Sequence, residues 1–486
     1  MTVNRTTSFA AVLRSSIILG VLCVAIAVAL SGPGAAAPPA PDEHTLTQPD
    51  GTTFNATQWG TEDNHGWQTT RGYTIIQGSD GWWWYATVTD GKLIPTEQKV
   101  VIDKPPESVS REVRGAAQTS VKYQSPDANI SSSASAQEAP QLQDAKPIPT
   151  TGTVKYPVIL VTYPDKDTTA SSEQMQQLVY GDNPEVASGP GSMRDYYLEA
   201  SGGQLKLDGN VSGWVTADHE HDHYQTQREG AELVQEAVRK ADDQIDYSQY
   251  DNNGDGYVDG VIVIHQGGGE EATGNPDDIW SHRWSLRGAR WYGASVSPYT
   301  SDDGVTINSY SVNPETYRGD ITTIGPLTHE TGHLLGMTDL YDTNGGSEGI
   351  GEWGLMGSGS WNAAGSYPTR QGSSPAHPTA FHKWQQGWIT PSQKSLTGPM
   401  GTLEPYAHTS ETFQWLENPY GPEIDGTGEY FLATYRQQTG FDKGLPGEGV
   451  LITHIDETRE SNQDEDHKLV DIEAADGQQD LDHSRN

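Results

Sequence analysis

Hydrophobic spacing divides the middle of the chain into alternating strands and helices. Nearly continuous apolar runs at residues 154–163 and 257–265 predict buried strands. A helix is predicted over 192–200, because Ser192 can cap its first turn. An amphipathic helix is predicted over 229–244, where apolar side chains recur at helical spacing at Val234, Ala237, Val238, Ala241 and Ile245. This alternation predicts an α/β domain.

The regions on either side follow strand patterns instead. Residues 45–101 are dense in strand-forming side chains separated by turn pairs such as Asp80-Gly81, which predicts a hairpin or meander. Three consecutive tryptophans, 82–84, could form a carbohydrate platform, but packing of these aromatics on a larger partner is the favoured interpretation. From residue 428 onward, two strand-forming runs joined by a Gly/Pro-rich turn predict a β-rich C-terminal region.

The N-terminus has the pattern of an export signal. Arg5 and Arg14 precede an apolar run at 17–30, and residues 35–37, all alanine, supply small side chains for cleavage. The apolar run is short for a bilayer span, so a removed signal peptide is favoured over an uncleaved anchor helix. Residues 104–150 are rich in Ser, Ala, Gln and Pro, which predicts a solvated linker open to proteolysis.

Charge and cysteine content exclude several classes of function. The chain carries 29 Lys and Arg against 66 Asp and Glu, a formal net charge of −37. This sign excludes a general nucleic-acid binder and disfavours docking onto anionic lipid through a basic patch. The single cysteine, Cys23, lies in the predicted signal peptide. The processed chain would therefore have no disulfide, no cysteine nucleophile and no cysteine metal ligand.

The strongest chemical signal is an H-E-x-x-H pattern that runs from His329 to His333. On a helix, residues four apart share a face, so both imidazoles can bind one metal ion. Glu330 lies beside them, where its carboxylate can reach a water on the metal rather than the metal itself. Zinc lowers the pKa of such a water, and Glu330 can take its proton during attack on a peptide carbonyl. The pattern predicts a zinc site with Glu330 as general base.

The residues after this pattern offer a third ligand. Gly336 lies three residues after His333, where a helix can end in the left-handed conformation that glycine adopts at low cost. The chain can then turn back and present Asp339 to the metal. Glu348 and Glu352 are the alternative ligands, and Asp339 is favoured because the nearby glycine explains the geometry.

Beside these residues, four further segments resemble the peptidase M6 family, the immune inhibitor A-like secreted bacterial metalloproteases. The resemblance implies a zinc endopeptidase acting on proteins or peptides, with His329 and His333 as ligands, Glu330 as base and Asp339 as third ligand. The segments are EWGLMGSGSW at 352–361, SMRDYYLEASGGQLKLDG at 192–209, DNNGDGYVDG at 251–260 and EYFLATYRQQTGFDKGLPGEGVLITHID at 429–456.

The resemblance also gives Met356 a role, because metzincin-type enzymes place a methionine turn beneath the metal as an apolar floor. Met356 is followed by Gly357 and Ser358, so the tyrosine that some of these families place two residues after the methionine is absent. A tyrosine that stabilises the oxyanion would have to come from elsewhere in the chain.

The resulting expectation is a secreted, extracellular protein with an α/β (α+β) metzincin-like zinc protease domain between β-rich flanking parts. The expected organisation is a signal peptide at 1–37, a β-rich N-terminal prosegment at 38–103, a linker at 104–150, an M6-like catalytic domain at 151–395 and a β-rich C-terminal region at 396–486.

Two weaker clusters are candidates for metal binding. Asp251, Asn253, Asp255 and Asp259 follow the spacing of a calcium loop, but Ile262 stands where the bidentate glutamate belongs. Calcium binding and a plain Asn/Gly turn are equally favoured there. The run of histidine and acidic residues at 219–223 could also hold a metal, although a charged surface loop is the favoured interpretation.

The main rival to a zinc protease is a non-catalytic secreted glycan- or cell-wall-binding protein that uses the tryptophans and the calcium loop. A calcium-dependent adhesive protein is a second rival. The intact Glu330 argues against the first rival, since a protein without catalysis would be free to lose it. The sequence predicts neither the cleavage specificity nor the oligomeric state.

Overall fold

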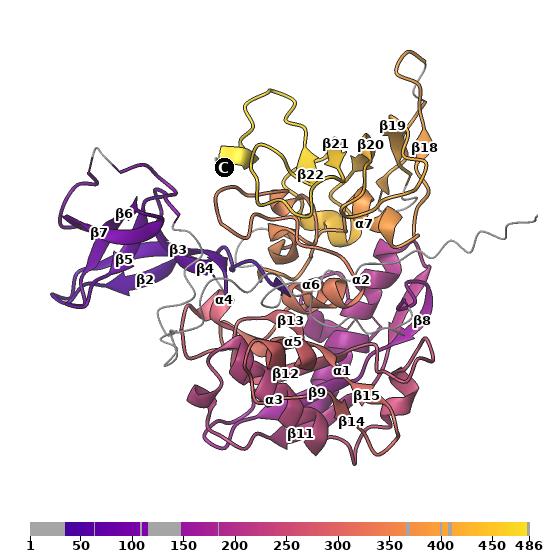
Figure 1. Cartoon of the computed structure of the whole chain (residues 1–486), viewed down its shortest axis with the longest axis horizontal. Coiled ribbons are helices and arrows are strands. Elements are labelled where there is room, and N and C mark those ends of the chain that lie inside the picture. Colours follow the sequence, from indigo (N-terminus) through magenta and orange to yellow (C-terminus); the bar gives the residue numbers. More distant parts are fainter. Residues whose placement is uncertain are drawn as a thin grey trace, which may run out of the picture.

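The computed structural model describes residues 35–62, 64–106, 109–114, 147–182, 184–365, 370–398, 401–406 and 411–483. Most of the predicted signal peptide and most of the linker lie outside these residues. A six-stranded sheet stands to one side of a larger body, and a C-terminal sheet lies against that body (Figure 1).

The larger body is built on one mixed sheet with the strand order β1-β13-β16-β12-β9-β11. Strands β11, β9, β12 and β16 run parallel, β13 is antiparallel to β16, and β1 is antiparallel to β13 at the edge. A short strand, β17, pairs with β16. The strands are β1 (Ala35–Ala36), β9 (Val158–Thr162), β11 (Val211–Thr216), β12 (Val261–Gly268), β13 (His282–Ser285), β16 (Ser309–Tyr317) and β17 (Asp320–Ile321).

Helices cover both faces of this sheet, which explains the continuous apolar runs in its central strands. Val158 and Leu160 of β9 point into one core, whereas Ile159 and Val161 point into the other, because successive strand residues face opposite sides. The first core is shared with α1 (Ser172–Tyr180), α2 (Met193–Ala200), α6 (Ile324–Leu334) and α7 (Ala380–Gln385), and the second with α3 (Gln227–Lys240) and α5 (Leu286–Trp291).

The two predicted helices are confirmed, with small shifts at their ends. Ser192 caps α2, and Thr226 caps α3 through a capping box with Glu229, so α3 begins and ends earlier than predicted. The remaining short helices are α4 (Glu270–Thr273), η1 (Glu185–Ala187), η2 (His221–His223), η3 (Tyr247–Tyr250), η4 (Gly351–Trp353), η5 (Ser358–Trp361), η6 (Gly440–Gly444) and η7 (Leu481–His483).

The prediction of one strand over 154–163 is wrong. The chain forms β8 (Gly152–Lys155), which pairs with β10 (Leu205–Asp208), and then changes partners to enter β9. Pro157, which has no N–H to donate, lies at the break. The strand predicted at 257–265 forms as β12 but begins four residues later. One more small pair consists of β14 (Tyr299–Thr300) and β15 (Thr306–Ile307).

The predicted N-terminal meander is confirmed. Six antiparallel strands follow one another in sequence order. Trp83 packs edge-on against Phe54 and Trp67 in the small core of this sheet itself, not on a larger partner, while Lys99 lies over the ring of Trp82. The strands are β2 (His44–Thr47), β3 (Thr53–Thr61), β4 (Asn64–Thr69), β5 (Thr74–Gln77), β6 (Trp83–Thr89) and β7 (Lys92–Lys99).

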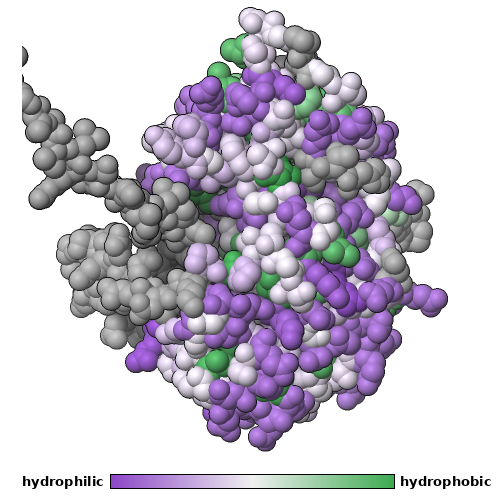
Figure 2. Space-filling view, turned by 90° about the vertical axis from the view of Figure 1, so that its right-hand side faces the viewer, coloured by the Kyte–Doolittle hydropathy of each residue, from purple (hydrophilic) through white to green (hydrophobic). Residues whose placement is uncertain are grey.

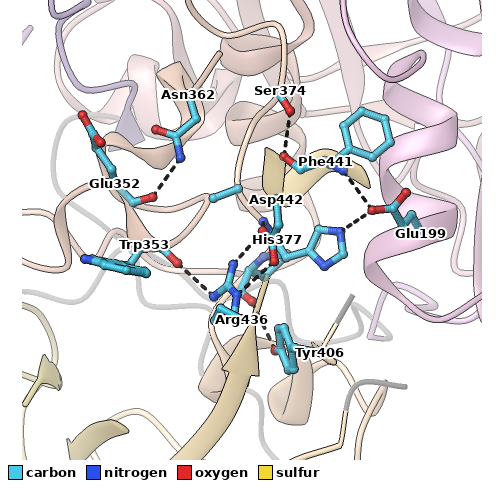
Figure 3. A network of polar contacts seen from close by, with 12 residues as sticks. Glu199, Glu352, Trp353, Asn362, Ser374, His377, Tyr406, Arg436, Phe441 and Asp442 are labelled. Carbon is cyan, nitrogen blue, oxygen red and sulfur yellow. Dashed lines mark hydrogen bonds and ion pairs between the residues drawn. The ribbon is translucent and has the colours of Figure 1, made fainter. Parts of the chain in front are cut away.

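The C-terminal sheet shares the first core of the larger body instead of forming its own. Tyr430, Leu432 and Ile455 pack in the same cluster as residues of α2 and α6. Arg436 forms a buried ion pair with Asp442 and donates to the main-chain carbonyl of Trp353, which ties the sheet to the body (Figure 3). Its strands are β18 (Ser392–Gln393), β19 (Phe413–Trp415), β20 (Glu429–Arg436), β21 (Gly449–Asp456) and β22 (Val470–Ile472).

The visible surface is mostly hydrophilic, with hydrophobic residues scattered in small groups (Figure 2). Within the described residues, no helix combines the length and the apolar character needed to cross a bilayer.

Candidate metal centre

Helix α6 places both histidines of the H-E-x-x-H pattern in the interior. All of its residues are buried, as its apolar composition requires. The Nε2 atoms of His329 and His333 lie 3.2 Å apart. The Nδ1 atom of His329 faces the carbonyl of Leu355 at 3.0 Å, and that of His333 faces the carbonyl of Met337 at 2.8 Å. These carbonyls hold the protons on Nδ1, which leaves both Nε2 lone pairs for a metal.

The chain reverses directly after the helix. Gly336 has φ of +88°, and the Met337 amide donates to the carbonyl of Gly332 at 2.9 Å, which closes the last turn. The reversal returns Asp339 to the histidines: its Oδ1 lies 3.2 Å from His329 Nε2 and 3.1 Å from His333 Nε2. Burial by itself would raise the pKa of Asp339. The two histidines beside it outweigh burial and lower this pKa to about 2.

His329, His333 and Asp339 fit a zinc ion. Within the described ranges, they form the one group of three metal-binding side chains whose ligand atoms converge within 4.8 Å. Two imidazoles and one carboxylate are a donor set of catalytic zinc sites, and a zinc ion held by them would keep a further position for water or substrate. The alternative ligands, Glu348 and Glu352, do not belong to this group; Glu352 lines a neighbouring cavity of about 560 Å³.

Glu330 is fully buried, and among the described residues neither of its carboxylate oxygens meets a hydrogen-bond donor in normal geometry. Burial raises its pKa well above the usual range, and the carboxylates of Asp339 and Glu271 raise it further, while the amide of Ala37 and the guanidinium of Arg283 oppose the shift. An uncompensated buried carboxylate costs stability, so its place beside the convergent ligands is typical of a functional group.

Met356 lies directly beneath the helix. It is completely buried, and its carbonyl accepts from the amide of Leu340 at 2.7 Å. The preceding carbonyl, of Leu355, is the one that orients His329. The turn around Met356 therefore fixes both a histidine ligand and the segment that follows Asp339.

An extended segment of the chain itself lies over this centre. Strand β1 pairs antiparallel with β13, and the Ala37 amide donates to the carbonyl of Ser281 at 3.0 Å. The indole N–H of Trp280 donates to the carbonyl of Ala37 at 2.7 Å, and that of Trp361 donates to the carbonyl of Pro38 at 2.8 Å. Residues 35–37, placed in the removed signal peptide by the sequence analysis, are thus part of the sheet in the full chain.

Sequence reasoning missed Tyr341, Trp280 and Trp361. The Tyr341 hydroxyl donates to the carbonyl of Ala36, so all three side chains hold the backbone of the same segment. Tyr341 stands two residues after Asp339, which was the only signal in the sequence that pointed to it. Trp361 ends the segment at 352–361 that carries the family resemblance, whereas nothing in the local pattern marks Trp280.

The candidate calcium loop satisfies its own side chains with hydrogen bonds. Both Asp251 oxygens accept from backbone amides, which belong to Gly254, Asp255 and Gly256. Asn253 donates to Asp259, whose pKa is raised to about 6 chiefly by burial. The Asp255 carboxylate accepts a hydrogen bond from the amide of Tyr257. Calcium binding at this loop stays a prediction.

The histidines at 219–223 point to separate partners. His221 pairs with Asp278 at 3.1 Å, and His223 faces Glu232 at 3.6 Å while its ring stacks on that of His219. In the part of the chain that is described, they form no group of three convergent ligands.

Comparison with known proteins agrees with the motifs. Residues 161–389 match the family described as immune inhibitor A peptidase M6, catalytic domain. The chain is 33% identical over 237 residues to immune inhibitor A of Bacillus thuringiensis subsp. alesti, covering 41% of this chain and 34% of that protein. It is 32% identical over 234 residues to the pre-pro-metalloprotease PrtV of Vibrio cholerae serotype O1, covering 43% of this chain and 24% of that protein.

The chain thus spans about a third of the length of the first relative and about a quarter of the second. The matched region contains the helix with both histidines, Asp339 and the turn around Met356. Residues 161–389 thus match the catalytic domain of the peptidase M6 family.

Proposed function

We propose that the chain is a secreted zinc-dependent endopeptidase that hydrolyses peptide bonds in proteins. The observation that carries this proposal is the convergence of His329, His333 and Asp339 beside the fully buried carboxylate of Glu330. The names of the relatives support a metallopeptidase, and the N-terminal pattern at 5–37 supports export.

A zinc ion held by these three residues would polarise the substrate carbonyl and make a water nucleophilic near neutral pH. Glu330 would accept the proton of the attacking water and pass it to the amide nitrogen of the bond that breaks. The backbone of β13 offers edge hydrogen bonds to an extended peptide, which holds the substrate in line with these groups.

The same strand β1 supports a proposal of latency. A signal cleavage before residue 35, instead of after the predicted residue 37, would leave residues 35–38 on the edge of β13, where they exclude a substrate. The processed chain would contain no cysteine that could block the metal. A peptide segment that occupies the substrate site would be enough to keep the chain inactive. We therefore propose that the uncut chain has low activity and that cleavage within residues 104–150 releases it.

The test of the proposed function is casein hydrolysis by the purified, linker-cleaved chain, with metal analysis in parallel. We expect about one zinc per chain, loss of hydrolysis with a zinc chelator and recovery on adding zinc. Glu330→Gln should abolish hydrolysis with zinc still bound, because the amide cannot accept a proton. Unchanged turnover in this variant would remove Glu330 as the base. A wild-type chain that binds glycans but never cleaves casein would favour the non-catalytic rival.

A further inference from the structure

Tyr341 holds the carbonyl of a peptide bond that lies at the metal centre. Its hydroxyl donates to the oxygen of Ala36. The amide of the next residue, Ala37, donates to the carbonyl of Ser281 at 3.0 Å and also lowers the pKa of the Glu330 carboxyl. Tyr341 therefore holds the carbonyl end of this peptide bond, while its amide end is held by the main chain next to β13. A substrate bound along β13 in the same direction would present its own carbonyl oxygen to Tyr341.

The position of Tyr341 is fixed from both sides. The Leu340 amide donates to Met356, and the Leu340 carbonyl accepts from Ile350 and from the side chain of Asn462. The carboxylate of the residue after it, Asp342, accepts from backbone amides of the following turn. The ring itself is almost fully buried, with its centroid 6.3 Å from that of His329. Such a donor is preorganised and needs no reorientation during a reaction.

Other buried groups near the centre are less suited to this role. The Tyr197 hydroxyl, which lies close enough to Glu330 to feel its charge, is engaged by the carbonyl of Thr328 at 2.7 Å. The imidazole of His382 lies near His333 and Asp339 but makes no hydrogen bond to the segment at 36–37. Of these three side chains, only that of Tyr341 donates to the peptide.

We propose that Tyr341 is a catalytic residue whose hydroxyl stabilises the negative charge that develops on the scissile carbonyl oxygen. During hydrolysis, the water oxygen bonds to the carbonyl carbon and the C–N bond breaks. The water proton moves through Glu330 to the amide nitrogen, and Tyr341 keeps its own proton throughout. Its hydrogen bond strengthens as the oxygen becomes an anion, so it favours the transition state over the substrate. This inference rests on the proposed endopeptidase function.

The test compares Tyr341→Phe with Tyr317→Phe in the linker-cleaved full chain. Tyr317 is a matched control, because its buried hydroxyl also bonds the N-terminal segment, at Asp42, and not the peptide at 36–37. We expect Tyr341→Phe to lower kcat by roughly 10²–10³-fold with KM nearly unchanged, as loss of one oxyanion donor does. Tyr317→Phe should keep kcat within about threefold, an effect far below that of a lost oxyanion donor.

Inhibitor binding distinguishes a catalytic role of Tyr341 from a purely structural one. A phosphinic peptide carries a tetrahedral anion, and Tyr341→Phe should weaken its inhibition by a factor similar to the loss in kcat. Inhibition by a product peptide, and zinc content, should stay as in the wild type. Equal weakening of both inhibitors, loss of zinc, or unchanged kcat would overturn the proposal. If Tyr341→Phe does not fold, Tyr341→Met, which also lacks a donor, is judged by the same two inhibitors.

Failure of this inference differs from failure of the proposed function. If the wild-type chain and Tyr341→Phe cleave peptides equally well, the catalytic role of Tyr341 is rejected and the endopeptidase function stands. A zinc-loaded wild-type chain without hydrolysis removes the endopeptidase function itself.

Discussion

Gly332 and Met356 approach so closely that a Cβ atom at position 332 would force the Met356 side chain to shift. A Cβ atom at position 332 would lie 2.9 Å from the Met356 sulfur and 3.5 Å from Leu355. Glycine within a helix costs about 1 kcal/mol relative to alanine, so its presence in α6 works against helix propensity. The close approach lets the methionine turn lie against the helix that carries both histidines, and the turn holds His329 through the carbonyl of Leu355.

Gly332→Ala should therefore destabilise the chain despite its better helix propensity. Overpacking costs typically about 1–3 kcal/mol, which exceeds the gain in propensity. The measurement is urea unfolding in a Glu330→Gln background, which prevents self-digestion. In a Met356→Ala background the clash is gone, so the same substitution should become neutral or stabilising. A cost of equal size in both backgrounds would place the strain elsewhere.

Asp339→Ala should reduce zinc affinity strongly. It removes one of three protein ligands, and loss of an outer hydrogen-bond partner alone already costs roughly 10–100-fold. Competition with a chromogenic chelator measures this affinity without any assay of activity. Glu348→Ala and Glu352→Ala are the matched controls and should retain zinc, since neither carboxylate joins the convergent group. Retained zinc in Asp339→Ala, with loss in one of the controls, would reassign the third ligand.

The latency proposal predicts that loosening residues 35–42 raises the activity of the uncut chain. Ala40 is buried, and its amide donates to the carbonyl of Glu271 at 2.7 Å, whereas Pro41 is exposed. Ala40→Glu should therefore displace the segment, because an unpaired carboxylate cannot be buried there at low cost. Pro41→Glu adds the same charge and should have no effect. The measurement is hydrolysis of a fluorogenic peptide before and after cleavage of the linker.

Full activity of the uncut wild-type chain would contradict this prediction. So would an activating cut whose new N-terminus, determined by sequencing, falls well outside residues 104–150. Equal activation by both glutamate variants would point to charge rather than displacement.

Lys383 predicts a pH dependence of stability. It is fully buried, and burial, assisted by Arg436, lowers its pKa to about 7 against the opposing carboxylates of Asp442 and Glu199. Its Nζ lies 3.2 Å from His377 Nδ1 and 3.8 Å from the ring centre of Tyr406. Figure 3 shows His377, Tyr406, Arg436 and Asp442 together around this point.

Between pH 7 and about 10, the unfolded lysine is protonated and the folded one is neutral. The unfolded state then binds more protons, so the wild type gains stability as pH rises, by at most about 1.4 kcal/mol per pH unit. The measured quantity is the difference in unfolding free energy between the Glu330→Gln chain with and without Lys383→Met. From pH 7 to 9.5, the unfolding free energy of the chain with Lys383 should rise relative to that of the Lys383→Met chain. A flat or falling difference would show that Lys383 stays charged in the fold.

The sequence by itself determined the features that depend on local spacing. Two histidines four residues apart must share a face of any helix, and Gly336 allows the reversal that returns Asp339, so the candidate ligands could be predicted. The helix after Ser192, the N-terminal meander and the C-terminal hairpin were predictable for the same reason. Each is stabilised within one helix or between strands that follow one another along the chain, and the periodicity of these elements is readable in the sequence.

Only the tertiary structure decided what lies around that helix. Tyr341 and Ala36 are 305 residues apart, and Trp280 and Trp361 reach the same segment from other parts of the chain. The break at Pro157 likewise depends on which strands pair, because β8 and β9 have different partners. Contacts of this kind are selected by sheet order and core packing together, and no local pattern in a single sequence records them.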